Sequence, residues 1–270
     1  MIPQPYIPEQ IIDYFEAISG LRAKMYGRYL MYTDADTSVV VGYPIQGEFN
    51  EEDVAKIVRE LLSIQKLENI IVIAPRLPAH LKFDEVKSDN YYRTALPVSV
   101  MGKRLRYMVS RASRELTIHL GKNLTKDHRS LIEDFLKRPD IQESTKYICS
   151  RLEYYLSRSN TVKVVNAYKR GGGLAGFDIV DLPPGEYSFY MFNIVSRRDN
   201  YVPGVSDLLL HYLLKISYES GKKYVNLGLG TNEGVARFKM KWGATPFLSY
   251  QYGIIRKTRI PKILDLFSKL

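Results

Sequence analysis

The sequence contains a single cysteine, Cys149, among 270 residues. One cysteine cannot form an intrachain disulfide or a multi-cysteine metal site, and its helical neighbourhood predicts a buried structural thiol. Only four histidines are present, and their spacing does not match a metal-ligand pattern. The composition therefore argues against a zinc enzyme, and we expect no metal.

Long hydrophobic runs are absent as well. The longest aliphatic stretch, DLLLHYLLKI, is too short and too polar to span a bilayer. The first residues, MIPQPYIPEQ, lack the basic region followed by an apolar region that is typical of a signal peptide. We therefore expect a cytoplasmic protein without a transmembrane segment.

What the chain does contain is enough apolar sequence for one or two domains and an excess of positive charge. Hydrophobic residues make up 45%, and the formal net charge is +10. A charge of this size favours anionic partners, although many basic proteins bind no nucleic acid. The net charge alone therefore leaves three possibilities open: binding of tRNA, binding of CoA, and peripheral contact with an anionic membrane.

The first third of the chain predicts a hairpin, a helix and a strand. Residues 28–33 and 37–44 flank the turn DAD, and residues 50–67 have the apolar spacing of an amphipathic helix with Asn50 as its N-cap. A buried strand follows at 69–75, whereas 76–100 show no clear pattern. Residues 101–116 predict a helix with five cations, which is either a solvated face or an anion-binding surface and which we take as the connection between two domains.

The remaining elements follow a distinctive order. We expect a strand at 115–120, helices at 125–138 and 142–158, strands at 161–168, 173–182 and 186–197, a helix at 206–220 capped by Ser206, a strand at 223–229, a helix at 232–242 and a last strand at 245–253. The glycines of KRGGGLAG lie between two strands and therefore predict a hairpin and not a phosphate loop.

This order is that of the GNAT acyltransferase superfamily. Within it, residues 202–244 (VPGVSDLLLHYLLKISYESGKKYVNLGLGTNEGVARFKMKWGA) resemble the C-terminal part of FemAB-type peptidyltransferases and of the cytosolic domain of phosphatidylglycerol lysyltransferases. Residues 39–62 are similar to the first GNAT-like domain of the lysyltransferases. The resemblance implies an α/β (α+β) protein with two GNAT-like domains in tandem, each a central mixed sheet flanked by helices. A degenerate domain would span 1–110 and an acyltransferase domain 111–270.

The resemblance also implies a site for the acyl carrier at the turn SRRDNYVPGVSD. The pyrophosphate would meet the helix N-terminus at Gly204, Val205 and Ser206, helped by Arg197 and Arg198, because a helix N-terminus favours anions. The arm of the carrier would run along Asn193, Ile194 and Val195. The usual family pattern has a leading cation and two small residues, and this turn keeps one glycine, which argues against acetyl-CoA. A capped helix with nothing bound is the alternative.

The segment RFKMKWG, residues 237–243, holds the remaining candidates. Phe238 stands where many GNAT enzymes have an acidic Tyr, and it has no proton to give. By the FemAB-like resemblance, Lys239 neutralises charge on the transferring group, electrostatically and not as a base. Arg237 and Lys241 lie on another face of the helix. They are candidates to bind substrate, unless they serve only to offset the helix dipole.

Two functions from different classes follow. The first is a transferase that moves an acyl or aminoacyl group from a CoA or tRNA carrier to an amine or hydroxyl acceptor. The second is a non-catalytic GNAT-like module that binds RNA or a protein partner, and it is supported by the single glycine, the missing Tyr and the basic segment at 102–114.

Overall fold

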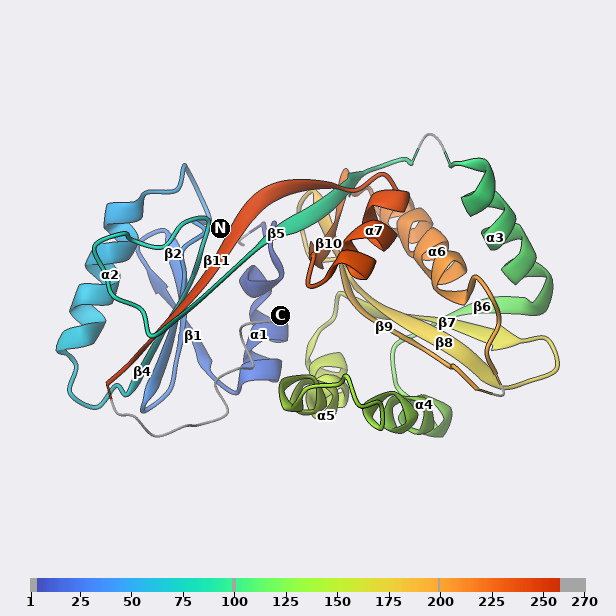
Figure 1. The fold of residues 1–270 in the computed structure, drawn as a ribbon, viewed down its shortest axis with the longest axis horizontal. Helices are drawn as coiled ribbons and strands as arrows, with labels where there is room; N and C mark the ends of the chain where they lie inside the picture. The colour runs from blue at the N-terminus through green and yellow to red at the C-terminus, as the bar shows by residue number, and fades with distance from the viewer. Residues whose placement is uncertain (1–3, 99–100, 199, 258–270) are drawn as a thin grey trace.

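The computed structural model describes residues 4–98, 101–198 and 200–257, and their strands form one mixed sheet (Figure 1). The sheet has 11 strands in the order β1-β2-β3-β4-β11-β5-β10-β9-β8-β7-β6. The strands are β1 (Arg22–Tyr26), β2 (Tyr29–Thr33), β3 (Thr37–Val41), β4 (Asn69–Ala74), β5 (Glu85–Ala95), β6 (Leu116–Gly121), β7 (Val162–Lys169), β8 (Leu174–Asp181), β9 (Tyr187–Val195), β10 (Tyr224–Leu229) and β11 (Thr245–Arg256). The helices are η1 (Pro8–Gln10), α1 (Ile12–Ser19), α2 (Glu51–Ser63), α3 (Lys103–Glu115), α4 (Lys126–Leu136), α5 (Glu143–Arg158), α6 (Val205–Glu219) and α7 (Glu233–Lys241).

The N-terminal half is built on the hairpin that the sequence predicts. β2 and β3 pair in antiparallel fashion, and β3 pairs in parallel with the buried strand β4. The Asn50 side chain accepts hydrogen bonds from the N–H groups of Glu52 and Asp53, so the predicted cap of α2 is confirmed. Helix α1 and strand β1 were not expected from the sequence, and α1 packs against α5 of the other half.

The C-terminal half follows the predicted element order. Helices α4 and α5 cover one face of its strands, and α3 and α6 cover the other (Figure 1). Cys149 is buried on α5, and burial raises the pKa of its thiol to about 11, which agrees with the predicted structural role. The predicted fold class is confirmed: the molecule is a mixed α/β structure with sheet strands flanked by helices in both halves.

Two strands are shared between the halves. β11, the last described strand, pairs with β4 through Gln251–Arg256 and with β5 through Thr245–Ile254. β5 in turn pairs with β10 of the C-terminal half. Figure 1 shows both strands running across the molecule from one half to the other. The sheet is therefore continuous, and the division at residue 110 stays a proposal about the two repeats and not about separate sheets.

The start of α6 differs from the sequence prediction. Gly204, with a left-handed φ of 88°, is the N-cap, so the prediction of Ser206 as the cap was wrong. The Ser206 hydroxyl instead donates to Asn193 Oδ1 at 3.2 Å. The reason for the glycine is the approach of α3, because a Cβ at residue 204 would lie 2.7 Å from the Met108 carbonyl oxygen. Within the described ranges, no helix is both long and apolar enough to cross a membrane.

Candidate functional site

A cleft opens where the parallel strands β9 and β10 separate. Their pairing runs from Tyr187 with Tyr224 to Phe189 with Asn226 and ends there. Beyond this point β9 contains a bulge, since Tyr190 and Phe192 pair with consecutive residues of β8 and Met191 is left over. The bulge turns β9 away from β10, and the ends of the two strands become the walls of a cavity.

The cavity has a volume of about 620 Å³, and its lining comes from both faces of the sheet. The apolar lining on the α5 side belongs to the core cluster that includes Tyr14 and Ile148. The apolar lining on the α6 side belongs to the core cluster against which Phe238 packs. The lining residues are Tyr14, Asp140, Thr145, Ile148, Tyr190, Met191, Phe192, Asn193, Arg197, Ser206, Leu227, Gly228, Leu229, Thr231, Asn232, Gly234, Val235, Phe238 and Lys239. The structure thus brings together four predicted site residues, namely Asn193, Arg197, Ser206 and Lys239.

Lys239 is the one cation of its helix that lines this cleft. Its side chain is 4% exposed, and Nζ donates a hydrogen bond to the Leu229 carbonyl oxygen at the end of β10. Burial lowers the pKa of the ammonium group to about 7, and the charge of Asp89 opposes this effect. A lysine of this kind exists in both protonation states near neutral pH.

Arg237 and Lys241 point elsewhere, as their spacing predicts. The exposed Arg237 pairs with Glu233 one turn earlier on α7. Lys241 Nζ lies 2.5 Å from Asp207 Oδ1, and the Trp242 indole N–H donates to the same oxygen at 3.2 Å. The lysine and the tryptophan therefore fasten the end of α7 to the first turn of α6, and neither predicted substrate-binding cation lines the cleft.

Asn193 and Ser206 form a polar network on the α6 side of the cleft. The Asn193 amide donates to Asp178 Oδ1 at 2.6 Å, and its oxygen accepts from Ser206. Asp178 is fully buried, and its second carboxylate oxygen has no hydrogen-bond partner among the described residues. Burial raises the pKa of the Asp178 carboxyl well above its ordinary value. The network fixes the Asn193 amide and leaves the Ser206 oxygen able to accept a hydrogen bond in the cleft.

The other residues predicted to hold the carrier are placed differently. Ile194 is buried on the α5 side, and Val195 packs against the cluster around α6. The Val205 N–H donates to the Val202 carbonyl oxygen at 3.1 Å. Gly204 faces α3 and does not line the cleft. Of the strip 193–195 and the turn 204–206, only Asn193 and Ser206 reach the cavity.

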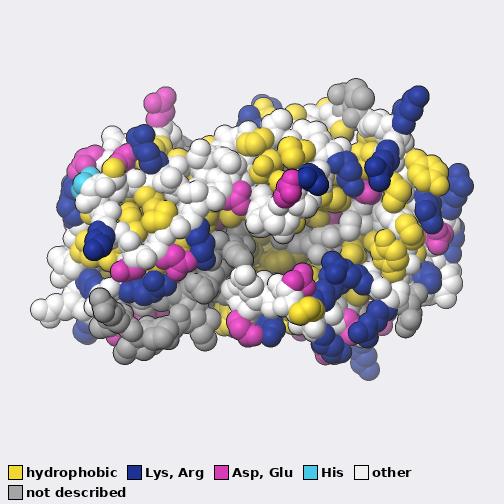
Figure 2. Space-filling model, viewed as in Figure 1, with side chains coloured by type: hydrophobic (Ala, Val, Ile, Leu, Met, Phe, Trp, Pro, Cys, Tyr) yellow, Lys and Arg dark blue, Asp and Glu magenta, His cyan; other side chains and the backbone are white. Residues whose placement is uncertain are grey.

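A basic pocket adjoins the cleft at Arg197. Its volume is about 300 Å³, and it is lined by Leu131, Asp134, Lys137, Arg138, Pro139, Ser196, Arg197 and Arg198. The Arg138 guanidinium donates to the Val195 carbonyl oxygen at 3.0 Å. Figure 2 shows Lys and Arg side chains gathered on the C-terminal half next to a recess with apolar side chains. Sequence reasoning missed Arg138, because its distance of 57 positions from Val195 hides the contact.

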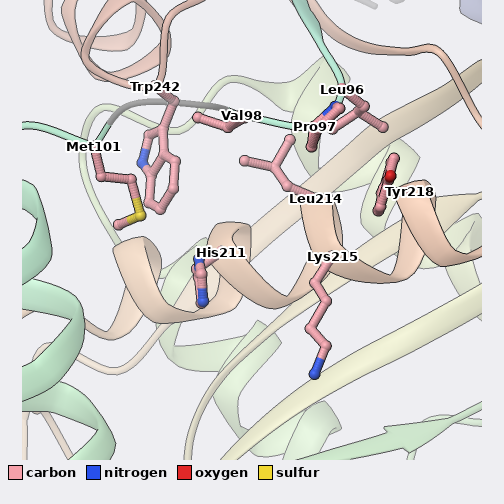
Figure 3. Close-up of a pocket in the computed structure, with 9 residues that line it drawn as sticks. All are labelled: Leu96, Pro97, Val98, Met101, His211, Leu214, Lys215, Tyr218 and Trp242. Atoms are coloured by element: carbon pink, nitrogen blue, oxygen red, sulfur yellow. The ribbon is translucent and has the colours of Figure 1, made fainter.

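A third cavity, of about 200 Å³, lies beside α6 and is mostly apolar (Figure 3). Its lining comes from α6, from the residue that follows α7, and from residues between β5 and α3: Leu96, Pro97, Val98, Met101, His211, Leu214, Lys215, Tyr218 and Trp242. The His211 ring stacks on Trp242 with 6.1 Å between the ring centroids. None of the predicted site residues lines this cavity. In the described part of the chain no three His, Cys, Asp or Glu side chains are grouped to hold a metal ion.

Comparison with known proteins shows the fold. No family model and no curated protein matches the sequence. The structure is similar to that of L-PGS from Bacillus licheniformis, with 17% identity, a TM-score of 0.59, and coverage of 92% of this chain and 87% of that chain. It is also similar to the C-terminal domain of a putative lysylphosphatidylglycerol synthetase from Agrobacterium fabrum (13% identity, TM-score 0.54, coverage 89% and 87%). A tandem GNAT protein from the clavulanic acid biosynthesis pathway matches with 14% identity, a TM-score of 0.51 and coverage of 86% and 79%. The chain has the tandem GNAT fold that its sequence predicts.

Proposed function

We propose that the protein is an acyl- or aminoacyltransferase and that the cleft between β9 and β10 is its active site. The observation that carries the proposal is the buried Lys239, whose Nζ is held at the end of β10 inside this cleft. A buried cation in a cavity lined from both faces of the sheet suits a reaction between two substrates. The carrier would bind on the α6 side, near Ser206, and the acceptor would approach from the α5 side, near Tyr14.

The reaction needs stabilisation of charge more than it needs a strong base. When an acceptor amine or hydroxyl attacks the acyl carbon, negative charge develops on the acyl oxygen, and then on the carrier atom as its bond to that carbon breaks. Lys239 in its protonated form supplies a positive charge in a site with little water, where such an interaction is strong. Phe238, the neighbouring side chain, cannot protonate the leaving group. In our proposal Lys239 stabilises the negative charge electrostatically, and the proton that the acceptor loses passes to the departing carrier atom.

Two groups of cations, one on α3 and one in the pocket that adjoins the cleft, support a polyanionic donor. Helix α3 carries Lys103, Arg104, Arg106, Arg111 and Arg114, and no carboxylate of the described residues lies within ion-pair distance of them. Arg197 connects the cleft to the pocket that holds Arg138 and Arg198. Phosphate groups of aminoacyl-tRNA would engage more of this surface than those of CoA. We expect transfer from tRNA to fall steeply with salt concentration and transfer from acyl-CoA to change little.

The test is a transfer assay with both donor classes and a panel of amine and hydroxyl acceptors. Lys239→Ala should reduce kcat on the order of 100-fold, because it removes a charge that acts in the transition state. Arg237→Ala is the matched control, since it removes an exposed cation from the same helix and should leave kcat unchanged. If Lys239→Ala retains full activity, or if neither donor class supports transfer at low salt, the proposal fails. Binding of RNA without transfer would then favour the alternative of a non-catalytic module.

A further inference from the structure

The loop that follows β10 is shaped by a carboxylate from the first third of the chain. Asp89, on β5, accepts hydrogen bonds from the N–H of Gly230 at 3.2 Å and from the N–H of Thr231 at 2.7 Å. The approach is close, because a Cβ at Gly230 would lie 2.8 Å from Asp89 Oδ1. Thr231 has a φ of 52°, a left-handed conformation that a β-branched residue rarely adopts. The two hydrogen bonds to Asp89 hold this strained residue in place.

The same loop begins at the carbonyl group that receives Lys239. Leu229, the last residue of β10, pairs with Tyr91, two residues after Asp89 on β5. Its carbonyl oxygen accepts the hydrogen bond from Lys239 Nζ, and both Leu229 and Thr231 line the cleft. The carboxylate, the strained loop and the lysine thus form one connected structure.

We propose that Asp89 is a positioning residue for Lys239: it holds the loop 229–232 so that the Leu229 carbonyl fixes Nζ, and its negative charge partly offsets the effect of burial in favour of the ammonium form. The structural part stands on the hydrogen bonds above, and the consequence for catalysis rests on the proposed function. The electrostatic part agrees with the pKa of Lys239, which burial lowers and Asp89 raises.

The other described charged groups near the cleft are less suited than Asp89 to position Lys239 and to favour its charged form. Arg237 and Lys241 are each paired with a carboxylate on α7 or α6. Tyr14 and Tyr190 have pKa values raised by burial, and both stay neutral near pH 7. The remaining titratable groups of the lining are Asp140 and Arg197. Asp89 is the carboxylate whose charge acts on Lys239.

The test measures the protonation of Lys239 without any donor or acceptor. Trace acetic anhydride labels neutral amines, and mass spectrometry of the Lys239 peptide at several pH values gives the midpoint of its labelling. Asp89→Asn removes the charge and keeps one of the two oxygens that accept from the loop, so one of the two loop hydrogen bonds can persist. Because the neutral amine becomes more populated, labelling of Lys239 at pH 6 should rise about threefold. Asp84→Asn is the matched control: Asp84, which immediately precedes β5, accepts the Arg256 N–H at 2.7 Å, and its replacement should leave the labelling unchanged.

A second variant separates charge from loop strain. Asp89→Asn combined with Thr231→Gly relieves the left-handed residue, so it should fold even where the single variant does not. An unchanged labelling midpoint in either folded variant would overturn the proposed role of Asp89. It would not affect the test of Lys239 in the transfer assay. A lowered midpoint together with full activity of Lys239→Ala would support Asp89 and remove the proposed function. If both proposals hold, the high-pH limb of the transfer rate moves to lower pH in Asp89→Asn and stays in place in Asp84→Asn.

Discussion

Lys239 is a basic side chain whose surroundings favour its neutral form. It is 4% exposed, and burial is the main cause of its low pKa. The unfolded chain holds the proton at an ordinary lysine pKa, so between about pH 7 and 10.5 it binds more protons than the folded chain. The stability of the protein should therefore rise with pH across this range.

The rise of stability with pH gives a prediction for Lys239→Met. The substitution removes the unfavourable burial of charge, so it should stabilise the protein more at pH 6 than at pH 9. From the change in pKa we expect the gain in free energy of unfolding to differ by about 3 kcal/mol between the two pH values. Urea denaturation at both pH values measures it. A gain that does not depend on pH would mean that Lys239 is not buried as described, and Arg237→Met is the exposed control.

At the same scale, the sequence could single out Lys239 but not its environment. Helical spacing separates it from Arg237 and Lys241, and the family resemblance gives it a role. Its burial depends on the approach of β10, and its partner Asp89 lies 150 positions earlier. Contacts over such distances follow from the pairing of strands, which local patterns do not determine.

At the scale of elements, the contact between α3 and α6 depends on one glycine. Gly204 combines a left-handed φ of 88° with the close approach of the Met108 carbonyl oxygen. Gly204→Ala should therefore lower the free energy of unfolding by about 2–4 kcal/mol, through strain and steric overlap together.

Gly221, at the other end of the helix, offers a matched control. Its φ is 74°, and a Cβ there would meet no atom within 4 Å. Gly221→Ala should lower the free energy of unfolding by about 1 kcal/mol, because it introduces only the backbone strain of a left-handed alanine. Equal losses for the two variants, measured by thermal or chemical denaturation, would contradict the role of α3.

β5, like α1 and β1, was not assigned from the sequence. Its residues, EVKSDNYYRTA, include Lys, Asp and Asn, which are uncommon in strands, and only Tyr91 and Thr94 among them are buried. The strand exists because β10 and β11 flank it on both sides. By contrast, α2 and the hairpin of β2 and β3 carry local signals, and they were predicted correctly.

At the scale of the molecule, the two halves are joined because strands far apart in the sequence pair with each other. β5 comes from the first 100 residues and pairs only with β10 and β11 within the described chain, and β11 comes from the end of the chain and pairs with β4. A cut between β5 and α3 should therefore leave two fragments, neither of which folds alone, because each lacks a strand that completes its sheet.

Mixing the two fragments should restore the folded protein. Circular dichroism and size-exclusion chromatography of the separate and mixed fragments measure this outcome. An independently folded C-terminal fragment would show that β5 is not required there. In the mixture, Asp89 would arrive on one fragment and Lys239 on the other, so labelling of the lysine reports whether the site has reassembled.

The continuous ladder of β5 and β11 also affects how substrates reach the cleft. Nine residue pairs join these two strands along their length, and the ladder crosses from one half to the other. A hinge motion between the halves would have to break backbone hydrogen bonds between β5 and β11. We therefore expect the two halves to move together as one rigid unit. Changes in access to the cleft should then be local, at lining residues such as those of the loop 229–232.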